Sequence, residues 1–181
     1  MEDSRYVRNR LLFAKLRLDQ LSQIAGGDFG AVSETERQQP LQEFFFHLVG
    51  AIEFLAQTVN DSRKLIAGEE DVTPQEVSRK LPNSDPIKGL LRQLYPPTRR
   101  RQLHQDPYSE DGSHFRIIAF RNRVCHHGRN PFYFRVGSNP PCSLFLDPRN
   151  RSMGSDKPAM DELILFWTLV NDKCEKVLSA P

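Results

Sequence analysis

Apolar positions between residues 7 and 59 recur at alternating spacings of three and four, which is the period of an amphipathic helix. The first stripe consists of Val7, Leu11, Ala14, Leu18, Leu21 and Ala25. A glycine pair at 26–27 follows it and favours a helix end there. The second stripe begins after Pro40 and consists of Leu41, Phe45, Leu48, Ile52, Leu55 and Val59. Two long helices with such stripes predict bundle packing at shallow crossing angles.

The middle of the chain has a broken pattern that predicts short helices. Thr73 is placed as an N-cap, with Pro74 in the first turn and Glu76 completing a capping box. A second short helix is expected over the sequence DPIKGLLRQLYPP, where the two final prolines close it. Residues 98–112 are polar and predict a loop.

The remaining pattern predicts two more helices with an insertion between them. One helix is expected from Ser113 to Gly128, and the last from Ala159 to about Leu178. The stripe of the last helix contains Leu163, Trp167, Val170, Cys174 and Val177. Between the two helices, FYFRV and SLFLD predict a β-hairpin, and PRNRSMGSDKP predicts a loop. The expected fold is one mainly α domain over 1–181, a bundle of about four longer helices with short extra helices and a hairpin insertion at 132–158.

The composition narrows the class of protein. Hydrophobic residues make up 38% and charged residues 27% of the chain, which permits a sizeable core and argues against global disorder. No run approaches the roughly 20 apolar residues of a membrane span, and the N-terminal MEDSRYVRNR lacks the apolar core of a signal peptide. The cysteines are odd in number and scattered, which does not suggest a disulfide framework: Cys125, Cys142 and Cys174. We therefore expect a cytoplasmic protein with no membrane association.

The charge is mild overall but locally basic. The formal net charge of +2 does not by itself require nucleic acid as a partner. Arginines are concentrated between residues 99 and 135: Arg99, Arg100, Arg101, Arg116, Arg121, Arg123, Arg129 and Arg135. Such residues are often only solvated, so the cluster alone is weak support for a nucleic-acid partner.

The sequence FRNRVCHHGRNPF, residues 120–132, concentrates the candidate chemistry. On a regular α-helix, Ile117, Phe120 and Val124 share an arc that should face the core. Asn122 and His126 are four residues apart and lie one above the other on a different face.

Ala119 lies between these two positions in projection, so this second face is small and polar. Arg121 projects about 140° away from His126 by the same arithmetic. The two side chains would meet only if the arginine bent around the helix, or if two copies of the helix faced each other across a dimer axis.

The run from Arg121 to His126, RNRVCH, resembles the Arg-polar-x-x-x-His motif of HEPN domains. These domains are compact α-helical bundles, many of them metal-independent ribonucleases that act as homodimers, and their motif ends a late helix that one more helix follows. The resemblance implies that Arg121, Asn122 and His126 are catalytic, with no metal or other cofactor. It implies RNA and a second copy of the chain as partners. Many members are toxins or defence proteins, so an antitoxin protein is a further candidate partner.

The chemistry of these residue types agrees with RNA cleavage. If the 2′-hydroxyl attacks its own phosphate, a histidine can move the proton and an arginine can bind the phosphate charge. Asn122 can orient the imidazole or the phosphate. DNA, which lacks the 2′-hydroxyl, should survive. The neighbouring Arg123, His127 and Arg129 are candidates for substrate binding.

Other interpretations stay open at this point. His126 and His127 could simply complement the C-terminal end of a helix, and this suits His127, which projects towards Phe120. A zinc site is disfavoured, because Cys125 and the two histidines are consecutive and cannot all point at one ion. A phosphate-accepting histidine, or a non-catalytic module that binds a protein or a nucleotide, is also compatible with the pattern. Cys125 is best explained as a small packing residue.

Overall fold

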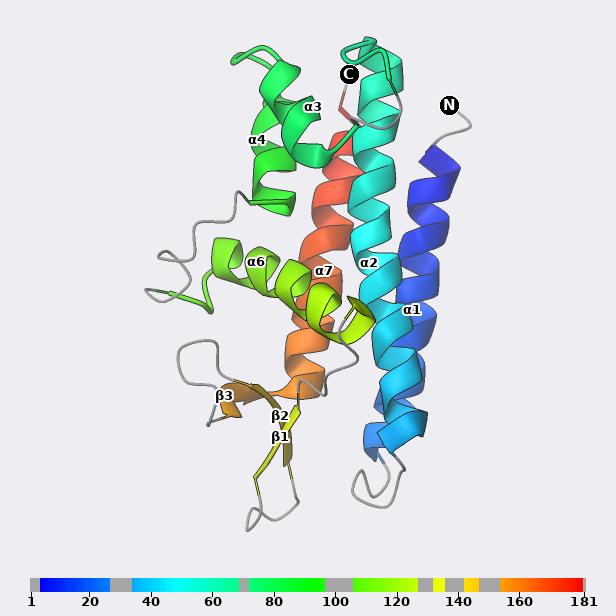
Figure 1. Ribbon diagram of the computed structural model, residues 1–181, viewed down its shortest axis with the longest axis vertical. Coiled ribbons are helices and arrows are strands. Elements are labelled where there is room, and N and C mark those ends of the chain that lie inside the picture. The colour runs from blue at the N-terminus through cyan, green and yellow to red at the C-terminus, as the bar shows by residue number, and fades with distance from the viewer. Residues whose placement is uncertain are drawn as a thin grey trace.

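The protein is mainly α-helical, as predicted. The computed structural model describes residues 4–26, 34–68, 72–96, 106–126, 132–135, 142–146 and 154–180. Three long helices run side by side (Figure 1): α1 (Ser4–Gly26), α2 (Glu34–Arg63) and α7 (Ala159–Leu178). Helix α6 (Glu110–Arg121) crosses them, and a short π-helical turn, η2 (Asn122–His126), continues it. No helix in these described ranges is long and apolar enough to cross a bilayer.

The predicted stripes of α1 and α2 are the faces along which the two helices bury their side chains. Val7, Leu11 and Leu18 of α1 are buried, as are Phe45 and Ile52 of α2. Helix α2 begins at Glu34, so Pro40 lies inside the helix and not at its start. In α7 the core position is Phe166, while its neighbour Trp167 is half-buried and donates a hydrogen bond from Nε1 to the Leu11 carbonyl, 3.1 Å away.

Two short helices, α3 (Pro74–Lys80) and α4 (Pro86–Leu94), lie at one end of the bundle (Figure 1). The predicted cap of α3 is confirmed, because the Thr73 hydroxyl accepts a hydrogen bond from the Glu76 amide at 3.2 Å. The Glu76 carboxylate pairs with Arg79 at 2.7 Å. Asp85 caps α4 in the same way, through the Ile87 amide at 2.9 Å.

Helix α6 begins earlier than predicted. Its N-cap is Ser109, whose hydroxyl accepts a hydrogen bond from the Gly112 amide at 3.1 Å, so the expected start at Ser113 is wrong. Gly112 had suggested a loop, but it is required inside the first turn by close packing. A Cβ added at Gly112 would lie 2.4 Å from the Asp106 carbonyl oxygen and 2.7 Å from the Pro107 carbonyl carbon.

The 132–158 segment contains three strands, β1 (Phe132–Arg135), β2 (Cys142–Leu146) and β3 (Gly154–Pro158). They form one antiparallel sheet in the order β1-β2-β3, with Phe132 opposite Phe145 and Arg135 opposite Cys142. The prediction of a loop through residue 158 is wrong, because backbone pairing with β2 makes the last five residues a strand. The connections between strands lie outside the described residues, so the hairpin itself stays a prediction.

One side chain joins the sheet to the helical core. Phe145 of β2 is fully buried and its ring stacks on Phe120 of α6, with ring centroids 4.5 Å apart. Phe45 and Phe166 surround this pair at centroid distances of 5.7 Å (Phe45–Phe120) and 6.3 Å (Phe145–Phe166). This aromatic cluster fixes the position of α6 along α2 and α7.

A buried charged pair fixes the middle of α6. Arg116 donates a hydrogen bond to the Glu162 carboxylate of α7, and the two side chains are 3% and 1% exposed. The Arg116 guanidinium also lies 4.8 Å from the centre of the Tyr108 ring. Arg116 therefore belongs to the structure of the bundle, although the sequence had placed it among basic residues of the surface.

Candidate functional site

The candidate site begins where α6 ends. Regular α-helical geometry stops at Arg121, and residues 122–126 form a π-helical turn with hydrogen bonds from residue i to residue i+5. Two contacts from α2 secure this wider turn. The Gln42 Nε2 donates to the Val124 carbonyl at 3.0 Å, and the Cys125 thiol donates to the Gln42 carbonyl at 3.5 Å. The carbonyl of Val124 thus has a partner outside its own helix, which permits the wider turn.

The wider turn changes the relation between the two ends of the motif. α-Helical arithmetic separates positions 121 and 126 by about 140°. In an i→i+5 turn, position 126 lies about one full turn beyond position 121 and on the same side of the helix. The expected separation of about 140° assumed a regular α-helix, and the backbone of the π-turn brings the two positions closer in projection. The side chain of His126 lies outside the described part of the structure, as do residues 127 and 129.

Arg121 reaches towards α2. Its Nη2 atom donates a hydrogen bond to the Glu53 carboxylate at 2.8 Å. The Arg121 side chain is 19% exposed and the Glu53 side chain 47% exposed, so this pair lies at the surface. Ion pairs at such places contribute only about 0–1 kcal/mol to stability. The guanidinium is consequently held in place but is able to exchange one anionic partner for another.

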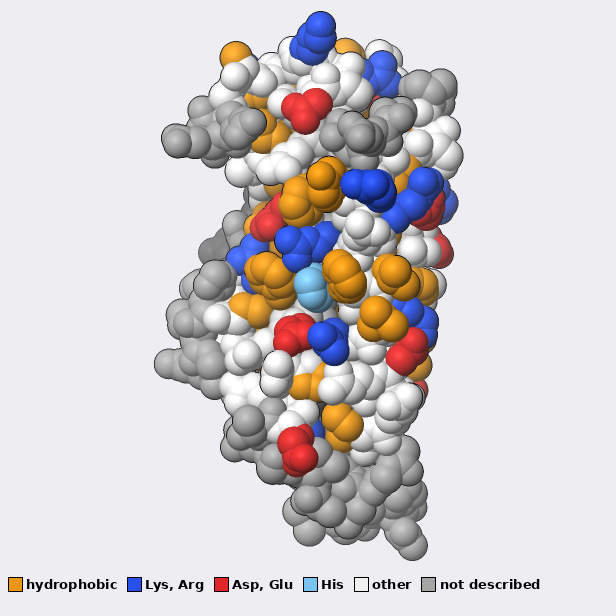
Figure 2. All heavy atoms as spheres, turned by 90° about the vertical axis from the view of Figure 1, so that its right-hand side faces the viewer, with side chains coloured by type: hydrophobic (Ala, Val, Ile, Leu, Met, Phe, Trp, Pro, Cys, Tyr) orange, Lys and Arg blue, Asp and Glu red, His pale blue; other side chains and the backbone are white. Residues whose placement is uncertain are grey.

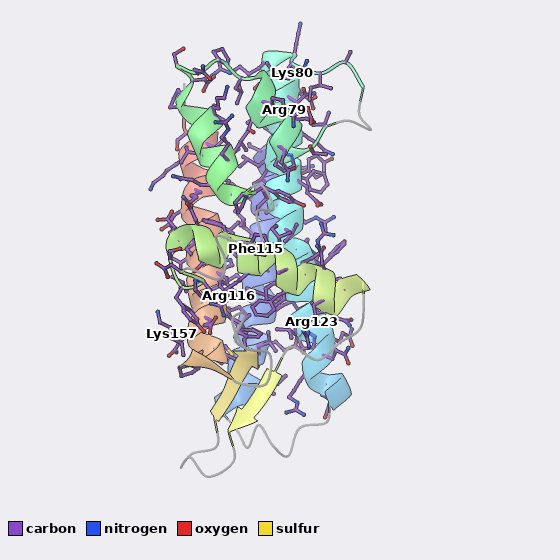
Figure 3. The ribbon with its side chains drawn as sticks, turned by 60° about the vertical axis from the view of Figure 1, so that its left-hand side comes forward. Arg79, Lys80, Phe115, Arg116, Arg123 and Lys157 are labelled. Carbon is purple, nitrogen blue, oxygen red and sulfur yellow. The ribbon has the colours of Figure 1, made fainter. Side chains whose placement is uncertain are left out.

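The other described residues of the motif fall on both sides of the turn. Asn122 is exposed and Arg123 is half-buried. Figure 3 shows Arg123 at the end of α6 next to α2, whereas Arg116 lies nearer α7. Val124 is fully buried, as its predicted core position requires. Ala119 is exposed, so the small face that it shares with Asn122 is open to solvent.

Cys125 is half-buried and packs against α2 through its contact with Gln42. Burial raises the pKa of its thiol, and Arg121 lowers this pKa by a smaller amount. A thiol with a raised pKa has little thiolate at neutral pH and is a poor nucleophile. These properties favour a packing role for Cys125. In the parts of the chain that the structure describes, no group of three histidine, cysteine or acidic side chains could hold a metal ion.

Another histidine lies inside α6, where the sequence had indicated nothing. His114 is fully buried, and neither ring nitrogen has a hydrogen-bond partner within the described residues. Burial, with a smaller effect of Lys173, lowers the pKa of His114 to about 4. The imidazole is therefore neutral at pH 7 and is shielded from any substrate.

A surface next to Arg121 also has no counterpart in the sequence predictions. We call it the aromatic strip; it consists of Tyr6, Arg10 and Phe13 of α1 and Phe46, His47 and Phe54 of α2. Arg10 donates a hydrogen bond to His47 Nδ1 at 3.0 Å, and burial, followed by Arg10, lowers the pKa of His47. A signal was present in the sequence, because Tyr6, Phe13 and Phe46 are aromatic residues that lie outside the apolar stripes of their helices.

Comparisons of the chain with protein-family models, with curated proteins and with solved structures found no match. Its function is therefore inferred from the motif, the turn that carries it and the surface around it.

Proposed function

We propose that the protein is a metal-independent endoribonuclease of the HEPN type, with Arg121, Asn122 and His126 at its active site. The single observation that carries the proposal is the π-helical turn directly after Arg121. π-Turns are rare and occur often at functional sites. In this proposal, the turn brings the two ends of the Arg-Asn-x-x-x-His motif towards one side of the helix, so that one phosphate contacts both.

The reaction would proceed within the RNA chain. The 2′-oxygen attacks the adjacent phosphorus and the bond from phosphorus to the 5′-oxygen breaks, which leaves a 2′,3′-cyclic phosphate and a 5′-hydroxyl. His126 accepts the proton from the 2′-hydroxyl or donates one to the leaving 5′-oxygen. Arg121 stabilises the extra negative charge on the phosphate through its forked donors. The exposed Asn122 orients either the imidazole or a phosphate oxygen.

The ion pair with Glu53 supports the part of Arg121 in this reaction. A carboxylate is a smaller anionic substitute for a phosphate, and Glu53 holds the guanidinium at the surface. Because the pair is exposed, its loss costs little, and a phosphate that makes two charge-assisted hydrogen bonds can replace it.

The proposal includes a homodimer. One histidine cannot be base and acid in the same step, whereas two motif turns near a two-fold axis would supply both groups. The exposed face of Ala119 and Asn122 is small enough to let a second helix approach. Light scattering at tens of micromolar should give twice the chain mass. A toxin or defence role in the cytoplasm, with an antitoxin as partner, belongs to the same proposal.

The test is incubation of the purified protein with total RNA, with and without a chelator. Cleavage should persist in the chelator and yield 2′,3′-cyclic phosphate ends. His126→Ala should cleave about 100- to 10,000-fold more slowly, because one acid–base group is lost. Its melting temperature should match that of the wild type. Activity that needs zinc or manganese, or an unimpaired His126→Ala variant, would contradict the proposal.

A further inference from the structure

The aromatic strip lies on the face formed by α1 and α2. Figure 2 shows this face, with hydrophobic side chains gathered around one histidine and with basic side chains among them. Tyr6 is 50% exposed, Phe13 46% and Phe46 51%. Large hydrophobic side chains that stay half-exposed next to a candidate site indicate a binding surface.

Each of these rings is held by a neighbour while much of its surface stays open. Tyr6 stacks on Phe54 with centroids 5.9 Å apart and an interplanar angle of 18°. Phe13 rests against His47 at 5.3 Å, and the Arg10 guanidinium lies 5.1 Å from the centre of the Phe46 ring. The rings are therefore ordered before any ligand arrives, which reduces the entropic cost of stacking a ligand on them.

The helix beneath the strip is basic. Residues 4–18 contain no acidic residue, and their basic residues are Arg5, Arg8, Arg10, Lys15 and Arg17. Arg10 and Arg5 lie over aromatic rings. The others pair with carboxylates at the surface: Arg8 with Glu175, Lys15 with Asp19 and Arg17 with Glu43. Exposed pairs of this kind are weak, so a polyanion can displace their carboxylates.

The spacing of the strip suits a single strand of nucleic acid. Tyr6 and Phe13 are seven residues apart, which is about 10.5 Å along α1 and about three nucleotides at 3.4 Å per stacked base. Phe46 and Glu53 have the same separation on α2, and Glu53 holds Arg121. Gly50 lies between them, and the Arg10 side chain passes over it, 3.6 Å from where a Cβ would stand, so the absence of a side chain at position 50 leaves room for this guanidinium on α2.

We propose that the aromatic strip binds single-stranded RNA and leads it to Arg121. The inference rests on the proposed ribonuclease function and names where its substrate lies. Bases stack on Tyr6, Phe13 and Phe46, while Arg10 and the basic side chains of α1 contact phosphates. A protein partner is the less favoured occupant, because a basic helix with interleaved rings complements a polyanion that carries aromatic bases.

The experiment measures binding apart from cleavage. The probe is a fluorescent RNA of about 12 nucleotides, within the usual site sizes of single-strand binders, with 2′-O-methyl groups that block the attacking oxygen. The Phe13→Ala/Phe46→Ala variant should bind it at least about tenfold more weakly than the wild type. Leu12→Ala is the matched control, because Leu12 is 55% exposed on the same helix but lies about 100° around it from Phe13.

The outcomes separate this inference from the proposed function. If the wild type cleaves RNA but the double variant binds the probe normally, the strip is not the RNA track and the ribonuclease proposal stands. If the probe binds through the strip and no RNA is cleaved, only the proposed function fails. Failure of the wild type to bind, or a dimer lost in the double variant with binding unchanged, would overturn the inference.

Discussion

Two arginines of α6 each meet a glutamate from another helix, but the settings differ. Arg116 and Glu162 are 3% and 1% exposed, whereas Arg121 and Glu53 are 19% and 47% exposed. A buried pair cannot lose one partner without leaving a charge in a low-dielectric interior. A surface pair can change partners at little cost. Arg116 therefore holds the bundle together, whereas Arg121, five residues later, is available for chemistry.

The largest effect is expected at the buried end. Glu162→Gln keeps the shape of the side chain but leaves the Arg116 charge uncompensated, so it should lower the free energy of unfolding by about 3–5 kcal/mol. Urea denaturation measures this. The double variant Arg116→Met/Glu162→Leu removes both charges and should regain most of the loss. If Glu162→Gln is as stable as the wild type, the buried pair is not what anchors α6 to α7.

At the exposed end, an arginine substitution should damage activity more than stability. Arg121→Ala removes a phosphate donor and should slow RNA cleavage about 100- to 1,000-fold. Its unfolding free energy should change by no more than about 1 kcal/mol. Glu53→Gln is the control: it removes the charge that competes for Arg121 and should leave cleavage at least as fast as in the wild type. A collapse of stability in Arg121→Ala would place this arginine with Arg116 as a structural residue.

The burial of His114, two residues before Arg116 on α6, leads us to expect that stability depends on pH. Its pKa is about 4 in the folded protein and near 6.5 when unfolded, so the unfolded chain binds more protons between these values. Stability should be full above pH 6.5 and fall by up to about 3 kcal/mol as the pH drops to 4.

Denaturation curves between pH 7 and 4.5 test this loss, and His114→Leu should flatten most of it. The contributions of two other titratable groups, Glu110 and His47, to the pH dependence must be distinguished from that of His114. Glu110 has a lowered pKa through its hydrogen bond to Lys173 and loses its contribution only at lower pH. The lowered pKa of His47 acts in the same direction as that of His114. An unchanged slope in His114→Leu would assign the acid sensitivity to other groups.

Much of the fold could be predicted because the long helices bury regular stripes. Leu11 in α1 and Val170 in α7 are core residues at the positions that the 3.6-residue period gave them. Strand β3 could not be predicted in this way. Its sequence, GSDKP, has low strand propensity, and it becomes a strand by backbone pairing with β2.

The candidate site was only partly predictable for a similar reason. The motif residues are visible in the sequence, but the turn that contains them contacts Gln42, which is 82 residues before Val124. The α-helical period of apolar positions within one segment cannot reveal a contact with a distant helix. The aromatic strip was not predicted from the sequence, because half-exposed rings such as Phe13 lie outside the pattern of core positions. Their neighbours come from a second helix.

The last prediction tests the turn itself. Gln42→Leu removes the side-chain donor from the Val124 carbonyl and should cost about 1–3 kcal/mol, because a buried acceptor loses its partner. The turn should then revert towards α-helical spacing, which moves positions 121 and 126 to different sides of the helix. RNA cleavage should fall although Arg121, Asn122 and His126 are unchanged.

Gln39→Leu is the matched control, since Gln39 is exposed near the start of the same helix and bonds only Glu43, at 3.0 Å, in the described contacts. Cleavage rates and melting temperatures of both variants decide the matter. Full activity in Gln42→Leu, despite the lower melting temperature, would mean that the π-turn is a packing feature and that the alignment of the motif comes from elsewhere.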